Sequence, residues 1–81
     1  MSELEDGRQK FLEMVKAIDP QVTVVIPTAP SNGLFLISLT KGSARKLITV
    51  SEDDIIDLTL DDLIREEVED RIRGTISSLR H

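Results

Sequence analysis

The sequence contains no cysteine and a single histidine, His81, which is its last residue. Without cysteine the chain forms no disulfide, no thiolate metal site and no cysteine nucleophile. One terminal histidine gives no basis for a histidine general base, a catalytic triad or a histidine-rich metal site. The chain also has no glycine-rich phosphate-binding loop, because Gly7, Gly33, Gly42 and Gly74 are scattered along it. We therefore expect no enzyme activity, no catalytic residue, no metal site and no cofactor.

Aromatic residues are also scarce, since Phe11 and Phe35 are the only two and tryptophan and tyrosine are absent. Surfaces that stack nucleic-acid bases need several exposed rings, and a net charge of −5 repels phosphate. Both features argue against general binding to nucleic acid or to anionic membranes. No apolar run has the length of a membrane span or signal sequence, and the lack of cysteine fits a reducing compartment. We expect a soluble cytoplasmic protein.

The composition is otherwise that of a folded protein, with 40% hydrophobic and 31% charged residues among 81. This length predicts one small domain over residues 1–81. A chain of this size buries only about 60–65% of its unfolded surface, so its core is small. A homodimer that shares a core would relieve this shortage, and we therefore expect self-association.

The pattern of apolar residues predicts a helix, three strands and two further helices. The first helix extends from Ser2 to Asp19, with Ser2 and Glu5 as a capping box and Pro20 as its stop. Residues 21–27, 34–40 and 45–50 alternate like strands, and a two- or four-residue turn joins the last two. A short helix begins after Ser51, and a long one capped by Thr59 follows it to about residue 79; the alternative is one continuous helix without a break at residues 57–59. The fold class is α+β: two layers, with helices on one face of a three-stranded antiparallel meander (α-β-β-β-α-α).

One face of the predicted sheet is apolar enough for the core, and its reverse face is also unusually apolar. Strand alternation places Phe35, Ile37 and Leu39 on the core face together with Ile48 and Val50. The same alternation places Leu34, Leu36 and Leu47 on the reverse face, with Val25 a further candidate. A freely solvated face should be more polar.

The long helix carries an apolar stripe that steps by four residues and therefore drifts around the helix axis. Residues Leu60, Ile64, Val68, Ile72 and Ile76 make up this stripe. The drift suggests that Gly74 kinks the helix or admits a close neighbour. Two interpretations of its far end remain: Ile76 and Leu79 pack on the first helix, or they pack across a dimer axis together with Leu34, Leu36 and Leu47.

The same helix carries a row of acids opposite its apolar stripe. Asp62, Glu66 and Asp70 lie four residues apart, where like charges repel. Acid–arginine pairs with the same spacing, which stabilise a helix, are Asp61–Arg65, Glu67–Arg71 and Glu69–Arg73. The acidic row is either a solvated face or a contact surface for a basic protein partner.

A basic cluster, Lys41, Arg45 and Lys46, lies at the predicted second hairpin. It supports an alternative function, a regulatory module associated with nucleic acid, although the overall charge opposes this. The element order is similar to that of double-stranded-RNA-binding domains. Those domains have a basic cluster at the start of their last helix, where this chain has Ser51-Glu52-Asp53-Asp54. The sequence therefore favours a non-enzymatic module for protein–protein contact or self-association, with the acidic helix as one contact surface.

Overall fold

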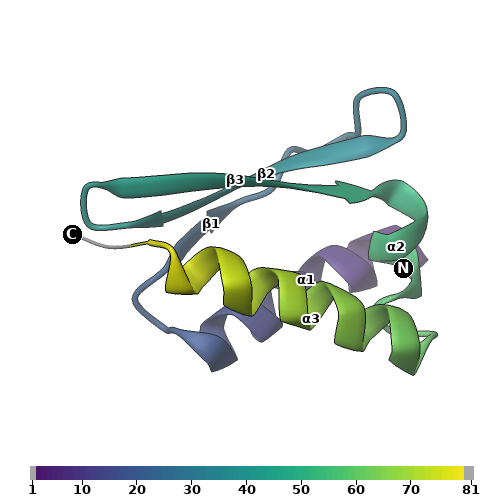
Figure 1. Ribbon diagram of the computed structural model, residues 1–81. Helices are drawn as coiled ribbons and strands as arrows, with labels where there is room; N and C mark the ends of the chain where they lie inside the picture. The colour runs from purple at the N-terminus through teal and green to yellow at the C-terminus, as the bar shows by residue number, and fades with distance from the viewer. Residues whose placement is uncertain (1, 80–81) are drawn as a thin grey trace.

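Residues 2–79 are described by a computed structural model, and they form one sheet covered on one face by helices (Figure 1). The elements are α1 (Glu3–Ile18), β1 (Thr23–Val25), β2 (Leu34–Lys41), β3 (Ala44–Ser51), α2 (Glu52–Asp57) and α3 (Asp62–Ser77). The sheet is antiparallel with the strand order β1-β2-β3. The predicted α+β architecture and element order are confirmed.

The strands are placed by two turns that use left-handed backbone conformations. Lys41 pairs with Ala44 across a two-residue turn in which Gly42 has φ 61°. The longer connection between β1 and β2 ends at Asn32 and Gly33, with φ 53° and 75°. Glycine and asparagine adopt this region at low cost, which explains their use here. The resulting register runs along all of β2 and β3 but joins β1 to β2 over only three residues.

The core lies between the sheet and the helices. It is formed by the predicted sheet face and by the inward faces of all three helices, including Phe11, Phe35, Ile55, Leu58 and Ile72, each with no exposed surface. Among the described residues no polar or charged side chain is buried. The core is therefore held by apolar burial, which contributes roughly 1.5–3 kcal/mol per fully buried large side chain.

Serine residues cap the first two helices as predicted, but Asp61 and not Thr59 caps α3. The Asp61 carboxylate accepts hydrogen bonds from the backbone N–H groups of Leu63 at 2.9 Å and Ile64 at 3.4 Å. The chain makes one more turn before α3, because the Asp61 N–H bonds to the carbonyl of Asp57. Leu60 consequently precedes α3 and is 62% exposed, so it does not belong to the buried stripe.

Gly7 lies at a close approach between α1 and α2. A Cβ atom at this position would stand 1.9 Å from the backbone oxygen of Ile55. Only glycine fits such a contact. The helix α1 begins at Glu3, before Gly7, and Gly7 allows α2 to pack directly on α1.

Candidate interaction surfaces

The reverse face of the sheet carries four large apolar side chains. No element of the described chain covers this face (Figure 1). Val25, Leu34, Leu36 and Leu47 are 59%, 45%, 55% and 52% exposed. They come from all three strands, and the register places Ser38 beside both Val25 and Leu47. We call these four residues the sheet patch.

Small polar side chains and one base accompany the sheet patch on this face. Thr49 lies opposite Leu36, and Arg45 lies opposite Thr40. The Arg45 Nε donates a hydrogen bond to the Ser38 hydroxyl at 3.2 Å, which holds the guanidinium stem across the sheet. The strands place no acidic side chain on this face, so two copies can approach here without repulsion between carboxylates.

Ile76 and Leu79 do not join this surface. They are 9% and 5% exposed and belong to the same core cluster as Phe11 and Phe35. The drift of the α3 stripe is accommodated within one chain, because α3 packs on both β3 and α1. Gly74, where the drift predicted a kink or a close neighbour, is exposed within a continuous α3, and its missing side chain faces open space.

The acidic row on α3 is exposed as predicted, but it is partly neutralised. Asp62 forms an ion pair with Arg65 at 2.8 Å, and this pair replaces the expected Asp61–Arg65 pair because Asp61 caps the helix. For Glu66 and Asp70 the structure shows no ion-pair partner within residues 2–79. All three carboxylates are exposed, and Glu66 and Asp70 are the unpaired part of the row.

The other expected pairs on α3 have different outcomes. Glu69 and Arg73 come within 3.7 Å, as their spacing predicts. The Arg71 guanidinium instead donates to the backbone carbonyl of Thr49 on β3, and it forms no ion pair with Glu67 among the described residues. Arg71 thus satisfies a carbonyl at the outer edge of β3, where the sheet ends.

The basic hairpin residues do not form one surface. Lys41 is bound to Asp19, with Nζ 2.6 Å from the carboxylate. Register alternation places Arg45 on the reverse face, while Lys46 pairs with Leu39 of the core face. Because one charge is neutralised and the other two diverge, the hairpin lacks the continuous basic surface that tracks a nucleic-acid backbone.

The Lys41 contact also changes the acidity of Asp19. The hydrogen bond from Lys41, followed by one from the Gln21 N–H, lowers the pKa of the Asp19 carboxyl below its ordinary value of 3.8. Both donors favour the ionised carboxylate. The pair ties the end of α1 to the end of β2.

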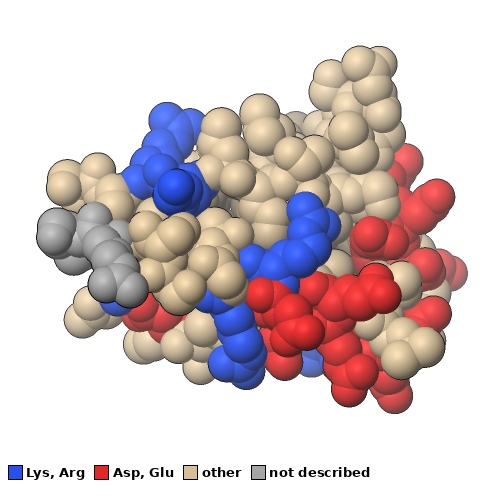
Figure 2. Space-filling view, viewed as in Figure 1, with Lys and Arg blue, Asp and Glu red and all other residues tan. Residues whose placement is uncertain are grey.

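Charge is segregated along the molecule. Acidic side chains gather over α2 and the start of α3, whereas basic side chains extend toward the opposite end, where β2 turns into β3 (Figure 2). The hairpin end therefore has the opposite charge to the α2 end. This arrangement gives each copy of the chain two complementary ends.

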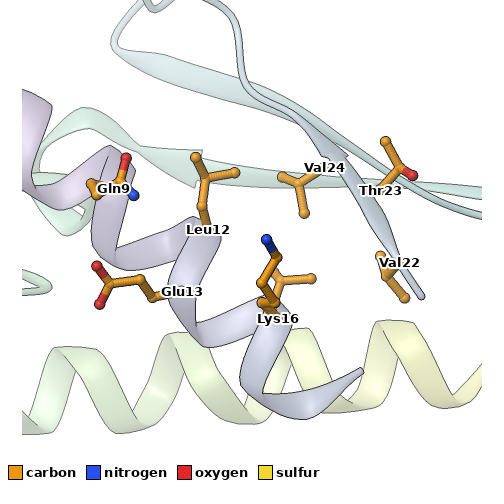
Figure 3. A pocket seen from close by; sticks show the side chains of 8 residues that line it. Gln9, Leu12, Glu13, Lys16, Val22, Thr23 and Val24 are labelled. Carbon is orange, nitrogen blue, oxygen red and sulfur yellow. The ribbon is translucent and has the colours of Figure 1, made fainter. Parts of the chain in front are cut away.

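A groove of about 350 Å³ between α1 and β1 was not predicted from the sequence. Its walls come from Leu12 and Lys16 on α1 and from Val22 and Val24 beside and within β1, as Figure 3 shows. Gln9, Glu13, Val15 and Thr23 complete the lining. Helical periodicity places Leu12 at the edge of the buried face of α1, but this does not predict a groove.

Other site types find no support in residues 2–79. In this range no group of three or more histidine, cysteine, aspartate or glutamate residues is placed to hold a metal ion. No helix there has the length and apolar character needed to span a membrane. His81 lies outside the described residues. Comparison of the chain with models of protein families, with curated proteins and with solved structures finds no match.

Proposed function

We propose that this protein is a non-catalytic, self-associating module whose sheet patch packs against the same patch of a second copy. The observation that carries the proposal is the exposure of Val25, Leu34, Leu36 and Leu47 on a sheet face that no described element covers. Contiguous apolar surface of this kind marks interaction sites in soluble proteins. Packing two such faces is the usual arrangement of a sheet sandwich, about 10 Å thick.

Charge segregation supports one orientation of the two copies. A two-fold axis between the sheets and across the strands would place the hairpin of each copy over the α2 end of the other. Arg45, which lies on the reverse face, would then approach the acidic group that includes Glu52 and Asp53. The alternative orientation would bring like charges together at both ends and is disfavoured.

The size of the patch supports a reversible dimer. Complete contact of the two reverse faces would bury roughly 1,000 Å² in total, at the low end for a specific interface. We expect dissociation constants of about 1–100 µM. Rising salt should weaken the dimer, because the end-to-end attraction is between exposed charges.

Sedimentation equilibrium with interference detection tests this proposal, since the chain has no tryptophan or tyrosine for absorbance. Wild-type protein should be dimeric at a few hundred micromolar. Leu36→Asp should be a folded monomer, because it places an unpaired carboxylate in the patch. Leu63→Asp is the matched control: Leu63 is 71% exposed on α3, and its replacement should leave the dimer intact.

Two outcomes would contradict the sheet patch as the interface. One is a wild-type monomer at 1 mM; the other is equal dimerisation of both variants. Replacing Glu66 and Asp70 by lysine tests the remaining contact surface, the acidic row. If that variant alone loses the dimer, the acidic helix carries self-association instead.

A further inference from the structure

The outer edge of β1 presents unpaired backbone groups to the groove. β1 is the last strand on its side of the sheet. Leu34 exchanges both backbone hydrogen bonds with Ser31, so it directs its N–H and carbonyl away from β3. By antiparallel alternation Ser38 and Thr40 do the same and bond to β1. Thr23 and Val25 receive these bonds, which leaves the N–H and carbonyl of Val24 directed outward.

On each side of Val24 one of the neighbouring outward groups is already bonded, which limits the length of the open edge. The Val22 N–H bonds to the Asp19 carbonyl at 3.1 Å, and the Ile26 carbonyl accepts from Arg8 at 3.4 Å. Pro27 has no N–H to donate. An added strand therefore pairs centrally with Val24 and ends close to these two positions.

The α1 wall of the groove supplies side-chain contacts for such a strand. Leu12 is 36% exposed and points from α1 toward β1, and the half-buried Val24 side chain points toward α1 (Figure 3). The Lys16 amine also extends toward β1, whereas Glu13 points away (Figure 3). Within the described residues Lys16 has no ion-pair partner. The groove thus combines an apolar floor, a free cation and an open strand edge.

From these features we propose that the α1–β1 groove binds an extended peptide segment of a partner protein as a fourth strand beside β1. The Val24 backbone pairs with the peptide backbone, which is the basis of binding by strand addition. Apolar side chains on one face of the peptide pack on Leu12 and Val24. An acidic side chain beside them pairs with Lys16.

The chemistry of the groove selects this occupant. An open strand edge is satisfied by another extended backbone, and period-two alternation places every second peptide side chain over α1. The volume of about 350 Å³ accommodates a few such side chains. Lys16 favours a peptide of negative local charge over a basic one.

Two synthetic heptapeptides with blocked ends serve as probes. Both alternate threonine with valine around a central residue that is glutamate in one and lysine in the other. Titrated into ¹⁵N-labelled protein, the glutamate peptide should shift the amide signals of Val22, Thr23 and Val24 and slow hydrogen exchange at Val24. A peptide with methylated backbone nitrogens should bind at least tenfold more weakly, because it lacks the donors that pair with the strand.

Variants of the groove test the side-chain contacts. Lys16→Glu should reverse the preference between the two peptides, by about 2- to 5-fold for an exposed ion pair, whereas Lys46→Glu on β3 should not. Leu12→Asp should weaken both peptides, and Leu63→Asp is its matched control on α3. Circular dichroism confirms that each variant is folded.

The proposal is overturned if neither peptide shifts the Val24 amide at 2 mM, or if the methylated peptide binds equally well. It is also overturned if the shifts map to Leu36 and Leu47, which would place the peptide on the sheet patch. If instead a second copy occupies the edge, the Val24 signals of free Leu36→Asp protein, which lacks the sheet-patch dimer, will depend on its concentration, which also contradicts the proposal. Leu36→Asp should keep peptide binding while losing the dimer, so the two proposals fail separately.

Discussion

Replacement of Gly7 by alanine is the sharpest test of how α1 and α2 pack. The new Cβ would lie 1.9 Å from the Ile55 carbonyl oxygen and 2.7 Å from its carbonyl carbon. Ordinary contact begins near 3.4 Å, so the two helices must separate by roughly 1.5 Å. The obstacle is backbone, and no side-chain rotation relieves it.

The expected effect is a balance of two opposing terms. Alanine favours a helix over glycine by about 1 kcal/mol. Overpacking costs about 1–3 kcal/mol and occasionally more, and moving α2 would also loosen Ile55 and Leu58, which have no exposed surface. We expect the upper end of this balance, a net loss of about 2 kcal/mol in the free energy of unfolding.

Gly74→Ala is the matched control, because a Cβ at Gly74 meets nothing within 4 Å. It should stabilise the protein by about 0.5–1 kcal/mol through helix propensity alone. Thermal unfolding followed by circular dichroism at 222 nm should show Tm falling by about 8–16 °C for Gly7→Ala and rising by about 2–8 °C for Gly74→Ala. Equal behaviour of the two variants would refute the close contact of α1 with α2.

Three further predictions concern caps and charges. Asp61→Ala should lower the free energy of unfolding, measured by urea unfolding, by about 1 kcal/mol. Thr59→Ala should change it by less than about 0.5 kcal/mol. A larger effect of Thr59→Ala than of Asp61→Ala would show that Thr59 is the cap. Joint replacement of Glu66 by glutamine and Asp70 by asparagine should stabilise the protein by a few tenths of a kcal/mol at low salt, because it removes the repulsion between the two carboxylates. This gain should vanish in 1 M NaCl. A loss of stability would mean that these acids have partners. Because the pKa of Asp19 is lowered in the folded state, its carboxylate stabilises the protein above pH 3.8, and this stabilisation is lost as pH falls through the folded-state pKa. Asp19→Asn should therefore be less stable than wild type at pH 7 and converge with it under acid conditions, whereas a constant difference across an acid titration would contradict the linkage.

Much of the sheet was predictable because β2 and β3 obey strict alternation. A one-residue change of register would exchange the two faces, so residues such as Phe35 and Leu36 fix it strongly. β1 is shorter than the strand predicted over residues 21–27, and the alternation of apolar residues could not predict this difference. The Val22 N–H is taken by Asp19 and the Ile26 carbonyl by Arg8, contacts set by the packing of α1 against this segment.

The cap of α3 and the role of Gly7 show where local rules were insufficient. Thr59 and Asp61 are both good capping residues, and the choice depends on how many residues the chain needs to pass from α2 to α3. From the sequence alone, Gly7 is only a residue of low helix propensity. Its purpose becomes visible only when Ile55, 48 positions later, is placed against it.

Some candidate surfaces could also be predicted from local sequence patterns, whereas others depend on contacts between distant elements. The sheet patch follows from alternation alone, because each of its residues sits on the strand face opposite the core. The predicted basic cluster of Lys41, Arg45 and Lys46 is not one surface in the structure, because Lys41 forms an ion pair with Asp19 at the end of α1. The groove depends on the separation of α1 from β1, which no local pattern encodes.

The two proposed contacts use different parts of the same sheet and are compatible. Packing on the sheet patch covers the reverse face, whereas strand addition uses the edge of β1 and the α1 side of the sheet. A peptide strand would widen each sheet and extend the reverse face at the Val25 side, where its outward side chains would meet the second copy. Because Val25 belongs to both β1 and the sheet patch, apolar outward side chains in a bound strand should strengthen the dimer, and charged ones should weaken it. Peptide binding and self-association are therefore coupled through β1, and the sign of the coupling is set by the partner's sequence.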